Sequence, residues 1–407
     1  MYYTHILGNG LRYVHLPLAS PVVYVGLAIG VGTRHERRGE YGLAHFTEHM
    51  LFKGTRLRSS ERIIRRLEEV GGELNAYTSK EETILYALCP KTYVRRALQL
   101  MCDIVQHSCF DAEELRKEQT VVIDEIHSYE DSPSELIWDE FEDILFRGHP
   151  LGHGILGTER SVSSFTQAKE RRFYQQHYRP NNMVVFVQGD VDAEGLAQYL
   201  EGLFPRTQEA VPHKHSYVPL ELSSEPSHRR RRRDTSQSHV MIGARAYALT
   251  DVRRLGLNLL VNILGGPGMS SWLNMSLREQ AGLVYQVECN YTSYSDTGLV
   301  AIYFGCSPEH EAEAIALAMA QLERMAAGAL TERELVAAKR QLKGQLTVAS
   351  DGHENYFLNA GKAFLHLGYI EPRERILERI DALQLSELMA IAREIFAPER
   401  MSTLIYR

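Results

Sequence analysis

The sequence predicts an α+β fold of two homologous domains, each a mostly antiparallel β-sheet flanked by helices. Two observations carry this prediction. Short strand-like segments are followed by longer segments with helical spacing of apolar residues, and motifs of the first half return in the second. Asn75-Ala-Tyr-Thr-Ser returns as Asn290-Tyr-Thr-Ser, and Phe110-Asp-Ala-Glu-Glu-Leu returns as Leu330-Thr-Glu-Arg-Glu-Leu. The offsets, about 214 to 220 residues, are typical of a duplicated domain with small insertions.

The first third of the chain supplies the predicted elements in order. Residues 2–7 and 11–16 form a predicted hairpin, because the intervening Asn-Gly favours a tight turn, and residues 22–31 form an apolar central strand. Helical spacing of apolar residues predicts helices over 42–54 and 60–70. A strand-like stretch, 74–88, is followed by predicted helices over 92–107 and 111–129.

Composition excludes several classes of protein. The 407 residues are 44% hydrophobic and 24% charged, which is an ordinary composition for a globular protein. A chain of this length is too long for a single hydrophobic core. A net charge of −7 argues against a nucleic-acid partner. The longest apolar stretch, 22–32, is too short to span a membrane, and no signal peptide is recognisable. Five cysteines, an odd number, suit reduced thiols rather than a set of disulfides. Together these features predict a cytoplasmic protein with no membrane partner.

A change of composition separates the two halves. Residues 205–233 are rich in proline and serine and include the run Arg229–Arg233, which is typical of a linker. We predict an N-terminal domain over 1–213, a linker over 214–233 and a C-terminal domain over 234–407. The arginine run could bind an acidic partner or a nucleic acid, but a solvated linker or edge-strand face explains it more simply.

The sharpest motif is His45-Phe-Thr-Glu-His49. Histidines four residues apart lie on one face of a helix, so both imidazoles can reach one metal ion. Glu48 projects beside them, where a carboxylate can take a proton from water activated by zinc. The alternative is a surface helix that happens to carry two histidines. A third ligand is needed, and the predicted helix 111–129 offers Glu118 and Glu125, two turns apart on one face.

This combination resembles the inverzincin metallopeptidases, a family that includes pitrilysin, insulysin and the mitochondrial processing peptidase. The resemblance continues through nearly the whole chain, in segments 42–55, 148–157, 177–183 and 277–285. It implies one Zn²⁺ per chain, bound by His45, His49 and Glu125. It also implies that Glu48 is the general base and that Glu118 orients a ligand histidine; a solvated helix carboxylate is the alternative for Glu118.

The resemblance further nominates Arg278 and Tyr285 as donors to the developing oxyanion, in the same chain or across a dimer. The alternative is a helix-end arginine and a core tyrosine. Asn75 and Ala76 are nominated as substrate contacts on a strand edge, and the alternative is a turn followed by an ordinary strand. The second half has no counterpart of the metal motif, so we expect it to be an inactive copy that clasps substrate and takes part in dimerisation.

The expected function is that of a zinc endopeptidase acting on peptides or unfolded segments inside an enclosed chamber, as a homodimer or as a heterodimer with a related subunit. One alternative is a non-catalytic assembly or binding subunit. Another is a metal-dependent hydrolase of non-peptide substrates. A second metal site at Cys102, His107 and Cys109 is conceivable, but buried thiols at an apolar helix end explain these residues more simply.

Overall fold

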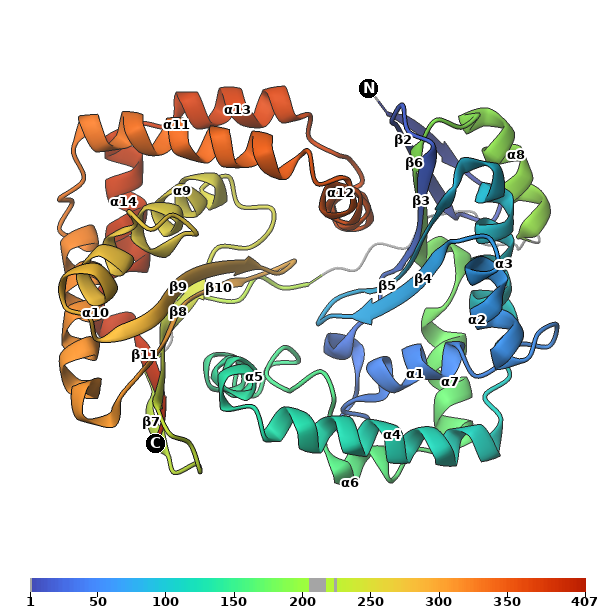
Figure 1. Ribbon diagram of the computed structural model, residues 1–407, viewed down its shortest axis with the longest axis horizontal. Helices are drawn as coiled ribbons and strands as arrows, with labels where there is room; N and C mark the ends of the chain where they lie inside the picture. Colours follow the sequence, from blue (N-terminus) through green and yellow to red (C-terminus); the bar gives the residue numbers. More distant parts are fainter. Residues whose placement is uncertain (1, 205–216, 223–224) are drawn as a thin grey trace. The chain divides into compact units, whose positions relative to one another are not determined.

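The computed structural model describes residues 2–204, 217–222 and 225–407. The chain folds into two compact units, whose elements are labelled in Figure 1. Unit 1 takes its described residues from Met1–Ser128, His153–His215 and Ser350–Ile370. Unit 2 takes its described residues from Tyr129–Gly152, Ser216–Ala349 and Glu371–Arg407. Each unit therefore includes a segment that lies, in the sequence, inside the other half.

A six-stranded sheet forms the centre of unit 1. Its order is β1-β2-β6-β3-β5-β4, and all neighbours are antiparallel except the parallel pair β2–β6. The strands are β1 (Tyr3–Ile6), β2 (Arg12–Pro17), β3 (Val22–Ile29), β4 (Glu73–Thr78), β5 (Thr83–Pro90) and β6 (Met183–Gly189). β4 lies at one edge of this sheet.

Helices cover both faces of this sheet. The helices are α1 (Leu43–Leu51), α2 (Ser60–Glu68), α3 (Val94–His107), α4 (Ala112–Glu130), α6 (Glu159–Val162), α7 (Gln167–His177), α8 (Ala193–Leu203) and α12 (His353–Leu367), with short 3₁₀ turns at Thr33–His35, Lys91–Tyr93 and Pro180–Asn182. Alternate side chains of the strands point to opposite faces. One set packs with α1–α4, α7 and α8, whereas the other packs with Phe357 and Phe364 of α12.

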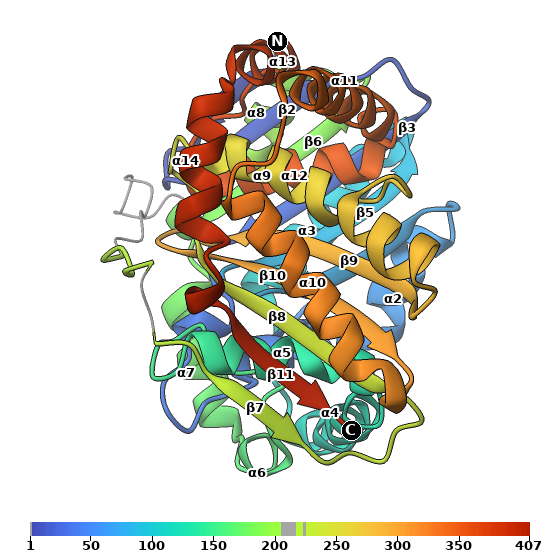
Figure 2. The ribbon, with the colours of Figure 1, turned by 90° about the vertical axis from the view of Figure 1, so that its left-hand side faces the viewer.

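Unit 2 repeats this plan around a five-stranded sheet, β7-β11-β8-β10-β9, seen side by side in Figure 2. Its strands are β7 (His228–Arg231), β8 (Ser238–Ala246), β9 (Val284–Ser293), β10 (Gly298–Cys306) and β11 (Ser402–Tyr406). Its helical elements are α5 (Pro133–Leu145), α9 (Arg254–Gly265), the π-helical η4 (Asn274–Gln280), α10 (Glu311–Ala326), α11 (Glu332–Ala349), α13 (Arg373–Ala382) and α14 (Leu385–Ile395), with 3₁₀ turns at Pro308–His310 and Pro398–Arg400. α9, α10, α11 and α14 contribute to the core on one face, and α5 covers the other.

The two halves exchange one helix each. α5 follows α4 in the first half but packs its Ile137 and Phe141 against the sheet of unit 2. α12 follows α11 in the second half but packs against the sheet of unit 1. The exchange corrects the linear division into 1–213 and 234–407. Hydrophobic spacing shows that α5 and α12 have an apolar face, but it does not show which sheet that face covers.

The predicted linker, 214–233, also needs a correction. Residues 214–216 and 223–224 of it lie outside the described residues. His228–Arg231 form β7, an edge strand parallel to β11. Arg230 pairs with Glu311, and Arg231 and Arg233 both pair with Glu140. Much of the arginine run is thus neutralised within unit 2, in agreement with the simpler interpretation of a strand face.

The predicted α+β architecture of two homologous domains is confirmed. The predicted stretch 74–88 is two strands, β4 and β5, joined by the turn of residues 79–82. The repeated Asn-Tyr-Thr-Ser motif marks the corresponding hairpin of unit 2, β9 and β10. In both sheets the first strand of this hairpin lies at the edge.

Candidate metal centre

Helix α1 carries the His-Glu-His motif and is anchored by its apolar face. Leu43, Phe46, Met50 and Leu51 are buried in the core of unit 1. Because residues three and four apart share a face, His45, Glu48 and His49 are gathered on another part of the helix surface. Helical spacing within α1 therefore determines which side chains face the core and which gather on the face that carries the two histidines.

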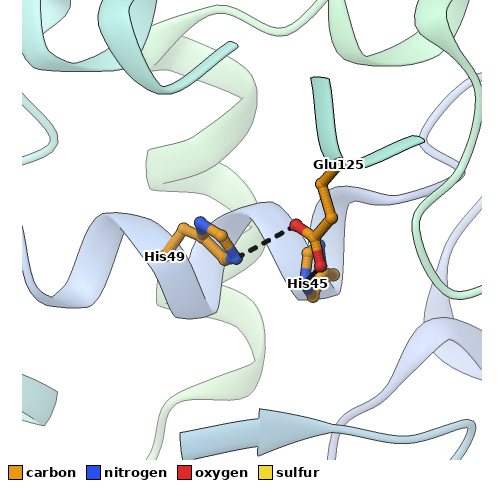
Figure 3. A group of neighbouring side chains, drawn as sticks. All are labelled: His45, His49 and Glu125. Atoms are coloured by element: carbon orange, nitrogen blue, oxygen red, sulfur yellow. Dashed lines mark ion pairs between the residues drawn. The ribbon is translucent and has the colours of Figure 1, made fainter. Parts of the chain in front are cut away.

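Three side chains meet there, as Figure 3 shows. Ligand atoms of His45, His49 and Glu125 all lie within 4.8 Å of one another. Glu125 reaches the histidines from α4, with its two carboxylate oxygens 3.7 Å from His45 Nε2 and 3.6 Å from His49 Nε2. The structure therefore brings together the three residues that the family resemblance nominated as ligands.

These distances fit a tetrahedral metal ion better than direct hydrogen bonds. Hydrogen bonds from nitrogen to oxygen are shorter, at about 2.7–3.2 Å. Two ligand atoms that each lie about 2.0–2.1 Å from zinc in tetrahedral geometry are roughly 3.3 Å apart. Two imidazoles and a carboxylate are also a common donor set of catalytic zinc, which leaves a fourth position for water.

Burial keeps His45 in the form that binds metal. Burial, with the neighbouring His49, lowers the pKa of His45 to about 3, so its imidazole is neutral over the physiological range. Among the described residues, His45 Nδ1 has no hydrogen-bond partner although it is buried. His49 differs from His45, because its Nδ1 has a hydrogen-bond partner in Glu118.

Glu118 holds His49 in orientation. Its Oε1 lies 2.8 Å from His49 Nδ1, which leaves Nε2 of the same ring toward Glu125. Lys53 pairs with the other oxygen of Glu118. Burial alone would raise the pKa of Glu118, but the hydrogen bonds from His49 and Lys53 lower it, so Glu118 stays ionised. A carboxylate on the distal nitrogen of a metal-binding histidine is the usual supporting arrangement. Sequence reasoning missed Lys53.

Glu48 is buried beside the site and hydrogen-bonded to strand β4. Thr78 Oγ1 donates to Glu48 Oε2 over 2.6 Å. Burial raises the pKa of Glu48, although the Thr78 hydrogen bond and the charge of His49 oppose the rise. A carboxylate with a raised pKa is well suited to accept and return a proton near neutral pH. Thr78 was also missed, although it follows Ala76 by two residues on the same strand.

Asn75 and Ala76 lie on β4, whose outer edge has no strand partner among the described residues. Their side chains point to opposite faces of the sheet: Ala76 packs toward the core that contains α1, whereas Asn75 is exposed on the other face. An extended peptide could pair with this edge through backbone hydrogen bonds.

Arg278 and Tyr285 belong to unit 2. The Arg278 guanidinium lies 5.8 Å from the centre of the Tyr285 ring. Both line a cavity of about 450 Å³ together with the glycine turn at 265–266. Tyr285 is 84% exposed, so it is not a core tyrosine, and both side chains are open to a ligand.

The N-terminus of α1 depends on residues that the motif did not reveal. Gly42 precedes the helix with φ of +93° and offers no side chain to cap it. Glu36 supplies the cap, because its carboxylate accepts hydrogen bonds from the backbone N–H of Gly42 at 2.9 Å and of Ala44 at 2.7 Å. His153 Nε2 lies 3.0 Å from the same carboxylate. Glu36 therefore holds the start of α1 just before His45, and His153, from a distant part of the sequence, contacts Glu36 in turn.

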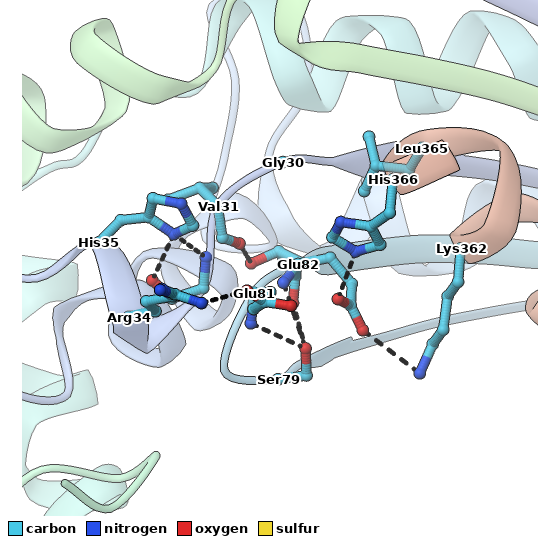
Figure 4. Close-up of polar contacts among 12 residues, drawn as sticks. Gly30, Val31, Arg34, His35, Ser79, Glu81, Glu82, Lys362, Leu365 and His366 are labelled. Carbon is cyan, nitrogen blue, oxygen red and sulfur yellow. Dashed lines mark hydrogen bonds and ion pairs between the residues drawn. The ribbon is translucent and has the colours of Figure 1, made fainter. Parts of the chain in front are cut away.

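The turn between β4 and β5 is anchored by charged side chains, shown in Figure 4. Glu81 pairs with Arg34 at 2.7 Å. Glu82 contacts His366 at 2.9 Å and Lys362 at 3.3 Å, both on α12. Burial alone would raise the pKa of Glu82, but His366 and Lys362 outweigh it and lower the pKa to about 2. The end of β4 that holds Glu48 is thereby fastened to α12.

No second group with metal-ligand spacing occurs in the described part of the chain. His107 instead hydrogen-bonds Asp103 at 2.9 Å, and burial raises the pKa of the Cys102 thiol. Cys102 is buried, whereas Cys109 is half-buried. None of the described helices is both long and apolar enough to cross a membrane.

Comparisons with known proteins agree with this geometry. Residues 17–159 match the model of the insulinase family, peptidase family M16, and residues 164–342 match the model named peptidase M16 inactive domain. An uncharacterized zinc protease of Bacillus subtilis is 33% identical over 402 residues, covering 98% of this chain and 96% of the relative. One of Streptomyces coelicolor is 32% identical over 404 residues, covering 96% and 86%.

Solved structures show the same fold. A protease from Helicobacter pylori aligns with a TM-score of 0.90 at 23% identity, covering 100% of this chain and 99% of the other. A protein from Pseudomonas fluorescens, described as a peptidase M16 inactive domain, aligns with a TM-score of 0.88 at 19% identity, covering 100% and 98%. At these identities the likeness supports the architecture alone.

Proposed function

This chain belongs to the insulinase family, peptidase family M16, and from that premise we propose that it is a zinc-dependent endopeptidase. Its relatives are named zinc proteases, which supports peptidase chemistry with zinc. The observation that carries the proposal is the convergence of His45, His49 and Glu125, with ligand atoms within 4.8 Å, beside the buried carboxylate of Glu48.

In the proposed mechanism the three ligands hold the metal and Glu48 moves the proton. When bound, zinc would polarise the peptide carbonyl and lower the pKa of water. Glu48 would accept a proton from the water that adds to the carbonyl carbon, and would deliver it to the amine as the C–N bond breaks. Glu118 would keep His49 in the required orientation through Nδ1.

The proposed substrates are peptides or unfolded polypeptide segments held in an enclosed chamber. An extended chain could add to the free edge of β4 next to Asn75 and Ala76. Arg278 and Tyr285 would donate to the developing oxyanion, from the same chain or from a partner subunit in a homodimer or heterodimer. A cytoplasmic location remains our proposal and rests on the odd number of cysteines.

A second candidate is a non-catalytic assembly or binding subunit. The C-terminal part matches a model named inactive domain, and the named relatives are uncharacterized. The complete ligand set with Glu48 favours the enzyme, because a subunit that only binds has no use for a buried carboxylate beside three convergent ligands.

The experiment compares wild type with Glu48→Gln, a variant of the same shape without the acid–base group. Zinc content is measured for both proteins, and cleavage is followed with a library of quenched fluorescent peptides. We expect one zinc per chain in both proteins, and a rate of cleavage by Glu48→Gln that is only a small residue of the wild-type rate. Wild type that binds zinc but cleaves no peptide, alone or mixed with a related subunit, would favour the binding subunit; wild type without zinc would overturn the proposal.

A further inference from the structure

We propose that Thr78 is a positioning residue for Glu48 and that it fixes this carboxylate to β4, the strand to which the substrate is proposed to add. The inference rests on the proposed function and assigns a task to a residue outside the metal motif. It starts from the 2.6 Å hydrogen bond between Thr78 Oγ1 and Glu48 Oε2, which joins α1 to the end of β4.

The direction of this hydrogen bond follows from the available protons. A threonine hydroxyl has one proton to donate, and an ionised carboxylate only accepts. Thr83, which pairs with Thr78 across the hairpin, donates its own proton to the Val31 carbonyl over 2.9 Å and lies 3.4 Å from Thr78 Oγ1. Thr78 therefore donates to Glu48, and Thr83 does not compete for the carboxylate.

Both partners are shielded from water. Thr78 is 9% exposed and Glu48 7% exposed. Hydrogen bonds to charged groups contribute more than those between neutral groups, and a buried carboxylate that loses its donor is costly to leave unpaired. Glu48 is thus held in one orientation by Thr78, with one oxygen, Oε2, engaged.

The position of Thr78 on β4 connects this orientation to the substrate. Residues two apart on a strand point to the same face, so Thr78 and Ala76 both face the side of the sheet that carries α1. They are separated by about 6.6 Å along the strand. A peptide paired with the β4 edge would therefore lie in a register fixed relative to Glu48, because the same strand holds both.

The turn after Thr78 keeps this end of β4 in place. Glu81 and Glu82 are buried and paired with Arg34 and with His366 (Figure 4). Because this turn is anchored, Thr78 moves little and can hold the Glu48 carboxylate in one orientation. Loss of the hydroxyl should consequently lower the rate of the chemical step more than substrate binding.

The test uses Thr78→Val, which removes the hydroxyl at nearly constant shape, and Thr78→Ser, which keeps it. Thr55→Val is the matched control, because Thr55 Oγ1 also donates to a buried carboxylate, Asp103, over 2.8 Å. We expect kcat of Thr78→Val to fall about tenfold to hundredfold, with KM within about twofold and zinc content unchanged. Thr78→Ser should recover most of the rate, and Thr55→Val should keep it.

A double-mutant cycle separates positioning from a general effect on the fold. In a Glu48→Gln background, Thr78→Val should cause no further loss of residual activity, since the group that it positions is gone. The inference alone is overturned if wild type cleaves peptides and Thr78→Val keeps its kcat, or if Thr55→Val loses as much. Inactive wild type would remove the proposed function, and this inference with it.

Discussion

Replacing Glu82 with glutamine should loosen helix α12 from the sheet of unit 1. Glu82 bonds His366 at 2.9 Å and Lys362 at 3.3 Å, both on α12. Its folded pKa of about 2, against an ordinary value of 4.5, corresponds to a ceiling of about 3 kcal/mol for these interactions. Local opening of α12 would break them, so the variant should open about tenfold to hundredfold more often.

The pH dependence has a definite sign. Because the pKa of Glu82 is lowered on folding, its contribution is complete above pH 4.5 and is lost as pH falls toward 2. The pKa of His366 is raised above 6.5, since its hydrogen bond and ion pair with Glu82 outweigh burial. That contribution is complete below pH 6.5 and is lost as pH rises through the raised value. The difference between wild type and variant should peak between about pH 4.5 and 6.5.

Amide hydrogen exchange of residues 353–367 is the suitable assay. Both tryptophans, Trp138 and Trp272, lie in unit 2, so their fluorescence would not report on α12 in unit 1. Glu61→Gln is the control: its pair with Arg65 is largely exposed and should contribute less than about 0.5 kcal/mol. Equal protection of α12 in wild type and Glu82→Gln near pH 5.5, or an equal difference at pH 3, would refute the reasoning.

Three further predictions concern the metal centre. Glu118→Gln should weaken zinc binding about tenfold to hundredfold in a chelator competition, and unchanged affinity would mean that His49 needs no orienting carboxylate. Gly42→Ala should lower the free energy of unfolding of unit 1, measured with denaturant, much more than Gly39→Ala does. Both glycines have positive φ, but of the two only Gly42 would bring a Cβ against a backbone atom, Leu156 O, at 2.4 Å. Chelation of zinc should abolish cleavage and lower the melting temperature, since free zinc at a thousandfold above its Kd adds about 4 kcal/mol; an unchanged melting temperature would contradict tight binding to the folded state.

The sequence was sufficient for those features that are local. Spacing four residues apart put His45 and His49 on one face of α1, and spacing seven residues apart put Glu118 and Glu125 on one face of α4. The zinc ligand set itself came from resemblance, because spacing left Glu118 and Glu125 equally open. Their separate tasks depend on a tertiary contact: Glu118 meets Nδ1 of His49, and Glu125 meets Nε2.

Other features depend on segments that meet only in the folded chain. Glu36 lies nine residues before His45 and caps α1. Nothing in the neighbouring sequence distinguishes it from a glutamate that is exposed to solvent. Thr78 resembles any threonine at the end of a strand. The contact of Glu82 with His366 joins residues far apart in sequence, and it required knowing that α12 covers the first sheet rather than the second.

The duplication explains the exchange of helices, and a comparison of the two copies explains why the described residues include one cluster of potential metal ligands. Helix α4 begins at Ala112 and α5 at Pro133, and α11 and α12 begin 220 residues later, at Glu332 and His353. α5 and α12 are thus equivalent elements, each covering the sheet of the other copy. The same offset places Ala338 and Gln345 of α11 where α4 carries Glu118 and Glu125. Neither Ala338 nor Gln345 is a carboxylate, so α11 offers neither of the acidic groups that α4 carries. The second copy thus keeps the β9–β10 edge hairpin, but its described residues include no cluster of metal-ligand side chains.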